Sequence, residues 1–113
     1  MIMISMPMGN DPNWRKKYKI IEEKLKAQGH EVAPLSYKEL YGKREPDLVD
    51  GLEIKNVPLL YMAHSFIRMS LCDTIYFAQG WENARGCQLE HQAAKAYGLK
   101  TIYENSEEKV RNI

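Results

Sequence analysis

Hydrophobic positions along the chain alternate between short continuous runs and longer amphipathic stretches. The short runs are rich in Ile, Met, Val, Phe or Tyr and stop at Pro, Gly or Asp, which is typical of buried strands. The longer stretches repeat apolar residues at helical spacing, with Lys, Arg and Glu between them. We expect strands over 2–6, 30–35, 73–79 and 100–104, and helices over 14–28, 58–72 and 84–97.

This alternation predicts an α/β fold with a parallel sheet of about four strands and helices on both faces. The 113 residues suit one domain, 1–113. With the strand order 2-1-3-4, the loops 7–11 and 80–86 flank the point where the order reverses. Ligands of open α/β sheets bind there, outside the carboxyl ends of the strands.

Two segments fit this pattern less simply. Residues 36–57 are polar and carry Gly and Pro, with a short helix expected near 37–40 and a loop after it, as in a lid or subunit contact. Helix 58–72 is apolar on most sides, so we expect it to be well buried. Residues 105–113 suit a short terminal helix.

Charge and composition exclude several classes of function. The 16 basic and 15 acidic residues give a net charge of +1, which offers no electrostatic basis for binding a nucleic acid polymer or a membrane surface. No apolar run approaches the ~20 residues of a membrane span, and we expect the N-terminal apolar run to be a strand and not a signal peptide. The Cys and His spacings match no metal site. We expect a cytoplasmic protein without metal or cofactor.

Glu90 is the leading candidate for chemistry. Its helical neighbours at three and four positions are Gly86, Cys87, Ala93 and Ala94, which are small enough to let a ligand approach the carboxylate. Leu89, Ala93 and Ala96 are expected to form the core-facing side of that helix. On spacing alone, a solvated helical glutamate is the commoner case. Cys87, near the helix start, is expected to have a lowered pKa but has no neighbouring base.

The loops at the strand ends supply the candidate ligand contacts. Loop 7–11 can offer backbone N–H groups to an anion, although an ordinary turn is the simpler interpretation. Asn83 suits a helix N-cap, Arg85 an anion partner, and Trp81 either stacking or packing. His64 suits either a core histidine or a ligand contact. The set also includes Ser5, Met6, Pro7, Gly9, Asn10, Ser65 and Gly86.

Two long motifs carry a family resemblance. "ISMPMGN" and "PLLYMAHSFIRMSLCDTIYFAQGWENARGCQLEHQAAKAYGLKTIYE" closely resemble a family of small phage and bacterial proteins grouped with the nucleoside 2-deoxyribosyltransferase-like fold. The resemblance covers nearly the whole chain except 36–57. It implies a flavodoxin-like three-layer sandwich and homo-oligomers whose sites are completed by a neighbouring subunit.

The resemblance also implies roles for single residues. Relatives that transfer deoxyribose or cleave deoxynucleoside monophosphates use a Glu matching Glu90 to attack the anomeric carbon. They hold phosphate and sugar at positions matching Ser5, Met6, Gly9 and 83–86. Ser65 stands where they carry an Asp, which places the departing base's proton donor in doubt. Either His64, next to it, takes that role, or the site binds a nucleotide without cleaving it.

These observations leave three hypotheses for function. The first is an enzyme that cleaves or transfers the N-glycosidic bond of a nucleoside or nucleotide, with Glu90 as nucleophile. The second is a non-catalytic nucleotide binder, such as a phage sponge that sequesters a nucleotide immune signal. The third is a structural or interaction protein with a vestigial pocket.

Overall fold

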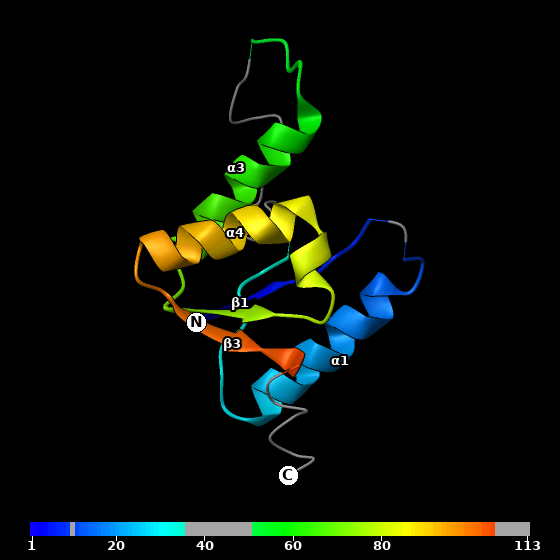
Figure 1. Cartoon of the computed structure of the whole chain (residues 1–113), viewed down its shortest axis with the longest axis vertical. Helices are drawn as coiled ribbons and strands as arrows, with labels where there is room; N and C mark the ends of the chain where they lie inside the picture. The colour runs from blue at the N-terminus through cyan, green and yellow to red at the C-terminus, as the bar shows by residue number, and fades with distance from the viewer. Residues whose placement is uncertain (10, 36–50, 106–113) are drawn as a thin grey trace.

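The centre of the molecule is a parallel sheet of three short strands. The computed structural model describes residues 1–9, 11–35 and 51–105, and within them the strands are β1 (Ile2–Ser5), β2 (Thr74–Phe77) and β3 (Lys100–Tyr103), in the order β1-β2-β3 (Figure 1). Ser5 pairs with Phe77, which pairs with Tyr103. The carboxyl ends of all three strands therefore lie along one edge of the sheet, where this class of fold binds its ligands.

The strand predicted at 30–35 forms only a single bridge. Val32 pairs in parallel with Ile2, and the Ala33 N–H donates to the Ile2 carbonyl at 2.8 Å. Pro34 has no N–H for a sheet, and the carbonyls of Pro34 and Leu35 accept from the Arg68 guanidinium at 3.5 and 2.7 Å. In the part of the chain that the structure describes, the sheet therefore has three strands rather than about four, and the order 2-1-3-4 is not confirmed.

Within the described residues, three helices and one short turn of helix accompany these strands. They are α1 (Trp14–Ala27), α3 (Val57–Met69) and α4 (Arg85–Ala96), with a 3₁₀ turn, η2, at Trp81–Asn83. Their bounds lie within three residues of those predicted from periodicity. The prediction that Asn83 is the N-cap of α4 was wrong. Asn83 ends η2, and Ala84 takes the cap position without a side-chain hydrogen bond. None of the helices in the described segments is long and apolar enough to cross a membrane.

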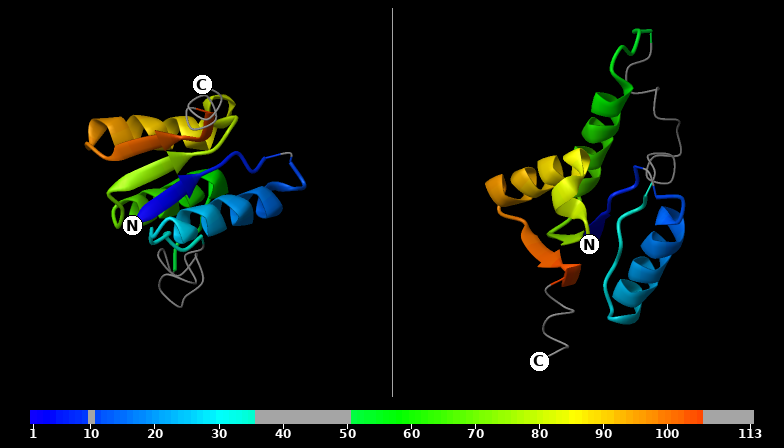
Figure 2. Two further views of the ribbon diagram at one scale, coloured as in Figure 1. Left: turned by 90° about the horizontal axis from the view of Figure 1, so that it is seen from below. Right: turned by 45° about the vertical axis from the view of Figure 1, so that its right-hand side comes forward.

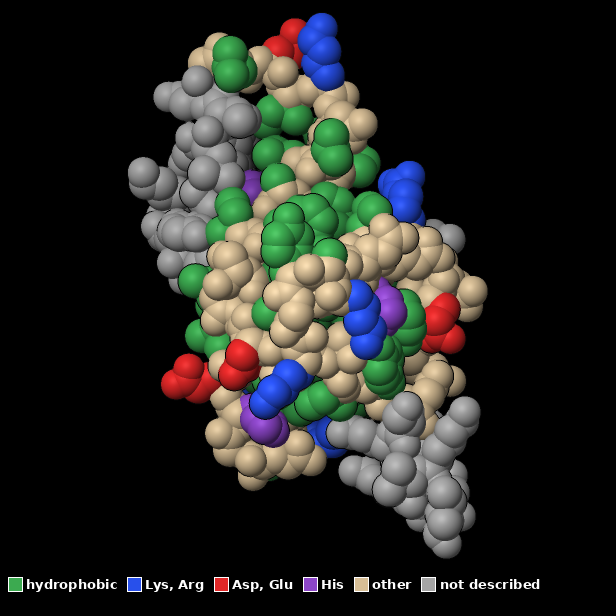
Figure 3. Space-filling model, turned by 60° about the vertical axis from the view of Figure 1, so that its left-hand side comes forward, with side chains coloured by type: hydrophobic (Ala, Val, Ile, Leu, Met, Phe, Trp, Pro, Cys, Tyr) green, Lys and Arg blue, Asp and Glu red, His purple; other side chains and the backbone are tan. Residues whose placement is uncertain are grey.

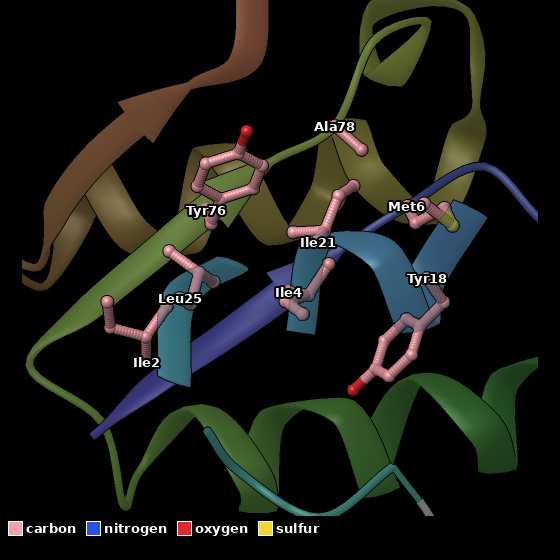
Figure 4. Packing of buried hydrophobic residues seen from close by; sticks show 8 residues of the cluster. All are labelled: Ile2, Ile4, Met6, Tyr18, Ile21, Leu25, Tyr76 and Ala78. Carbon is pink, nitrogen blue, oxygen red and sulfur yellow. The ribbon is translucent and has the colours of Figure 1, made fainter. Parts of the chain in front are cut away.

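The sheet is covered by helices on both faces. Period-two alternation along β1 and β2 sends Ile4 and Tyr76 toward α1, where they pack with Ile21 and Leu25 (Figure 4). The intervening residues face the other way and pack against α4 and the end of α3, with Met3, Ile75, Phe77, Met69 and Ala94 in one cluster. Figure 2 shows α4 and α1 on opposite sides of the strands, so the α/β arrangement with helices on both faces is confirmed.

Helix α3 does not meet the prediction that it is well buried. Only His64 and Met69 are buried along it, and it rises away from the sheet (Figure 1). Leu59 is 65% exposed and Tyr61 is 53% exposed. Its apolar composition therefore does not reflect packing within the described part of the chain. The helix expected near 37–40, and the terminal helix expected beyond Asn105, lie outside the described residues.

Candidate functional site

Glu90 lies on the face of α4 that packs against the sheet. The buried residues of α4 are Cys87, Glu90 and Ala94, spaced by three and four positions, so they form one stripe along the helix. The predicted core face was wrong, because Leu89 and Ala96 are exposed and only Ala93 of that set is partly buried. A carboxylate therefore occupies a position that the helix normally gives to an apolar side chain.

The partner of this carboxylate comes from the start of the chain. Ser5 ends β1, and alternation turns its side chain to the same face as Met3, toward α4. Its hydroxyl donates to Glu90 Oε1 at 3.1 Å, and both side chains are buried, with 1% and 7% of their surface exposed. A hydrogen bond to a charged acceptor in a low-dielectric setting is strong, so this contact fixes the Glu90 carboxyl in place.

Burial changes the protonation of Glu90. Removal from water raises the pKa of this carboxyl to about 7, while the Ser5 hydrogen bond and the Arg68 charge act in the opposite direction. Near neutral pH, the carboxyl is therefore divided between its acid and its ionised form. Carboxyls with pKa values near the working pH are typical of acid–base and nucleophilic sites.

Cys87 is the nearest buried sulfur to this carboxyl along α4. Burial raises the pKa of its thiol to about 11, a hydrogen bond with Ser5 lowers it, and the Glu90 charge raises it. The lowered pKa expected from its place near the helix start was therefore wrong. A thiol that keeps its proton at neutral pH is a weak nucleophile, which leaves the chemistry of this face to Glu90.

An open cavity of about 1430 Å³ adjoins the carboxyl end of β1 and the start of α4, and it reaches Glu90. It brings together most of the site residues predicted from the sequence. These are Met6, Pro7, Gly9, His64, Ser65, Asn83, Arg85, Gly86 and Glu90. Ser5 lies beneath the wall, in contact with Glu90, and Asn10 is outside the described residues. The candidates from the first strand end, α3 and α4 therefore converge on one cavity.

Arg68 and Arg15 also line this cavity and were not identified from the sequence. The Arg68 guanidinium donates to the Leu35 carbonyl at 2.7 Å and to the Ser65 hydroxyl at 3.3 Å. Arg68 lies three residues after Ser65 on α3, so helical spacing places both on one face, and this spacing was the available signal. Arg15 follows Trp14, whose ring lies 4.6 Å from its guanidinium carbon.

Trp81 lies away from the residues that line the cavity. Its ring stacks on His91 with centroids 4.3 Å apart and lies 5.1 Å from the Phe77 ring. Tyr103 completes the cluster through a 2.7 Å contact between its hydroxyl and His91 Nε2. These contacts make Trp81 a packing element that joins η2 to α4 and β3, and burial lowers the pKa of His91 within it.

No group of three His, Cys, Asp or Glu side chains within 1–9, 11–35 and 51–105 is arranged to hold a metal ion. Residues 1–103 match the family model described as "Domain of unknown function (DUF4406)". No curated protein and no solved structure matches the chain.

Proposed function

The chain belongs to this DUF4406 family, and from the residues that line its cavity we propose that it binds a nucleoside or nucleotide and cleaves or transfers the N-glycosidic bond, with Glu90 as the nucleophile. The observation that carries the proposal is a buried carboxyl with a pKa of about 7, lining a cavity at the carboxyl end of β1. The resemblance to nucleoside 2-deoxyribosyltransferase-like proteins adds the sugar C1′ as the atom attacked.

The charge of the cavity supports a ligand that carries phosphate. Arg15, Arg68 and Arg85 come from three different helices and line the cavity together with Glu90. Guanidinium groups bind phosphate oxygens through paired hydrogen bonds, and α4 begins at Arg85, where its free N–H groups also favour an anion. A nucleotide therefore fits the described wall better than an uncharged nucleoside.

The proposed reaction also needs a proton for the departing base. Ser65 is a poor acid, and its hydroxyl already accepts from Arg68. His64 lines the same cavity and is 5% exposed, with its ring edge-on to Tyr61 at 6.3 Å. An imidazole N–H can donate to a ring nitrogen of a departing base, so His64 is the residue we assign to the leaving base.

The second candidate function is a nucleotide binder that does not cleave its ligand. Ser65 in place of the expected Asp favours it, because binding through Arg68 and Arg85 needs no proton donor. Such a protein would retain an intact nucleotide, as a phage sponge for a nucleotide immune signal does. The two candidates share a ligand class and differ in whether Glu90 reacts.

Incubation with a panel of nucleosides, deoxynucleoside monophosphates and dinucleotides tests the first candidate. We expect release of a free base, measured by chromatography, and a loss of at least about a thousandfold in rate for Glu90→Gln with binding retained. Glu23→Gln, at an exposed position on α1, is the control and should react like wild type. An intact nucleotide bound at micromolar affinity without base release would support the binder, and absence of any binding would exclude both.

We also propose the flavodoxin-like arrangement implied by the resemblance. The parallel bridge between Val32 and Ile2 supports it, because it places segment 30–35 beside β1. That is the position expected for the strand that comes second in the sequence. The exposed apolar side chains of α3 support the expected homo-oligomer, since a second copy would cover them.

A further inference from the structure

We infer that Ser5 is a positioning residue that acts through Glu90, holding Oε1 of the carboxylate so that Oε2 meets the ligand. This inference rests on the proposed function, since Glu90 is the proposed nucleophile. It differs from the role that the family resemblance implies for Ser5, which is direct contact with phosphate or sugar.

The geometry separates Ser5 from the ligand. Its side chain is 1% exposed and is not among the described residues that line the cavity, whereas Glu90 is. The 3.1 Å hydrogen bond from Ser5 Oγ to Glu90 Oε1 is the contact that connects the Ser5 side chain to the cavity. A ligand in the cavity therefore meets the carboxylate, and the hydroxyl behind it determines how that carboxylate is oriented.

The single proton of the Ser5 hydroxyl is directed to Glu90. Cys87 is the other group hydrogen-bonded with Ser5, and burial raises the pKa of its thiol to about 11. The thiol keeps its proton near neutral pH and is a weak acceptor, whereas the ionised carboxyl is a strong one. The hydroxyl therefore donates to Oε1 and favours the ionised, nucleophilic form of Glu90.

The bond is compatible with the whole of the proposed step. Oε2 forms a bond to C1′ while the C1′–N bond breaks, and its electron pair stays on the base, which then takes a proton. Oε1 becomes the carbonyl oxygen of the glycosyl ester and still accepts from Ser5. The hydroxyl thus stays paired before and after the attack, and only Oε2 changes its bonding.

The test compares Ser5→Ala with wild type by two readouts. The first is the pH titration of the Glu90 side-chain carboxyl carbon by NMR, with Glu90→Gln assigning the signal. We expect its midpoint to rise by about one pH unit in Ser5→Ala, because a hydrogen bond to the ionised form is lost. The second is the pH dependence of base release. The apparent pKa of its acid limb should rise by the same amount, and kcat should fall about tenfold with KM little changed.

The titration also depends on the other groups that face Glu90. These are Arg68 of α3, which lowers the pKa of Glu90, the Cys87 thiol on α4, and the His64 and Arg15 side chains that line the same cavity. All of them are retained in Ser5→Ala. The control is Thr74→Val, which removes a buried hydroxyl opposite Ile2 at the other end of the sheet and should leave the Glu90 titration unchanged.

Three results would overturn the inference. An unchanged Glu90 midpoint in Ser5→Ala would show that the hydroxyl does not hold the carboxylate. A raised KM with unchanged kcat would show that Ser5 binds the ligand directly, and an equal shift in Thr74→Val would show a general loss of structure. Failure of the proposed function is a separate result, namely no base release by wild type, and the NMR titration tests the Ser5–Glu90 contact even then.

Discussion

At the scale of single residues, Glu90 exchanges stability for reactivity. It occupies a position on α4 whose neighbours in the buried stripe are Cys87 and Ala94, and the folded chain must keep a carboxyl out of water there. Burial raises its pKa to about 7 from an ordinary 4.5. The folded state therefore holds a proton that the unfolded state releases, and ionisation of Glu90 opposes folding.

The sign of this linkage gives a prediction for Glu90→Gln. The stability contributed by neutral Glu90 is fully present below about pH 4.5 and is lost as pH rises through about 7. We expect Glu90→Gln to be more stable than wild type by about 3 kcal/mol at pH 8 and to lose that advantage at pH 4.5. Urea denaturation at the two pH values measures the difference.

Glu23→Gln, exposed on α1, is the control for this prediction and should show no such pH-dependent gain. An advantage of Glu90→Gln that is the same at pH 4.5 and pH 8 would mean that the ionisation of Glu90 is not linked to folding.

At the scale of elements, α3 is held at both ends by polar contacts. The Asn56 side chain accepts from the Leu59 N–H at 3.0 Å and caps the first turn. At the other end, Arg68 donates to the Leu35 carbonyl at 2.7 Å. Because most of the apolar side chains of α3 are exposed, the Arg68 contact carries much of its attachment, whereas the Asn56 cap stabilises only its own first turn.

The cap gives a prediction with an internal control. Asn56→Ala should lower the free energy of unfolding by about 1 kcal/mol, because the first turn of α3 loses its side-chain acceptor. Asn13→Ala removes the same side chain from the N-cap of α1, where it forms no capping hydrogen bond, and should cost much less. Thermal unfolding of both variants measures the comparison, and equal losses would contradict the role of Asn56.

The sequence predicted the elements better than the faces they bury. Periodicity located three strands and three helices because each of these segments repeats its apolar residues at one spacing. It failed at 30–35, where only Val32 pairs with the sheet. Pro34 has no N–H, and the Pro34 and Leu35 carbonyls accept hydrogen bonds from Arg68. It also assigned Leu89 to the core, because no helical pattern indicates that the carboxylate beside it is the buried one.

The candidate site was predicted in part for a similar reason. Strand ends and helix starts are visible in a sequence, so most of the predicted site residues do line the cavity, although they form less than half of its lining. Arg68 was missed because its guanidinium reaches the cavity from the last turn of a helix that was expected to be buried. The pairing of Ser5 with Glu90 depends on the register of β1, which sequence spacing does not give.

At the scale of the whole molecule, apolar surface gathers on one side. Figure 3 shows hydrophobic side chains over α3 and the adjoining part of α4, and the exposed large ones there include Val57, Leu59, Tyr61, Phe66 and Leu89. Contiguous apolar surface of this kind marks association in soluble proteins. A second copy of the chain is the occupant we propose.

This surface gives a prediction about mass in solution. We expect wild type to sediment as an oligomer. Leu59→Glu should raise the Kd of this oligomer at least about tenfold and leave the circular dichroism spectrum unchanged. Ile20→Glu, at an exposed apolar position on α1, is the control and should keep the wild-type mass. A monomeric wild type at high micromolar concentration would contradict the proposal.

The Ser5–Glu90 hydrogen bond joins residues that are 85 positions apart in the chain. Closing so long a loop is slow and entropically costly, so no fragment that folds locally can contain both groups. Activity should therefore return last during refolding, after the helical signal has recovered. A fragment that begins at residue 51 should need a peptide of residues 1–35, added in trans, to be active. The proposed nucleophile would thus report on the completeness of the entire fold.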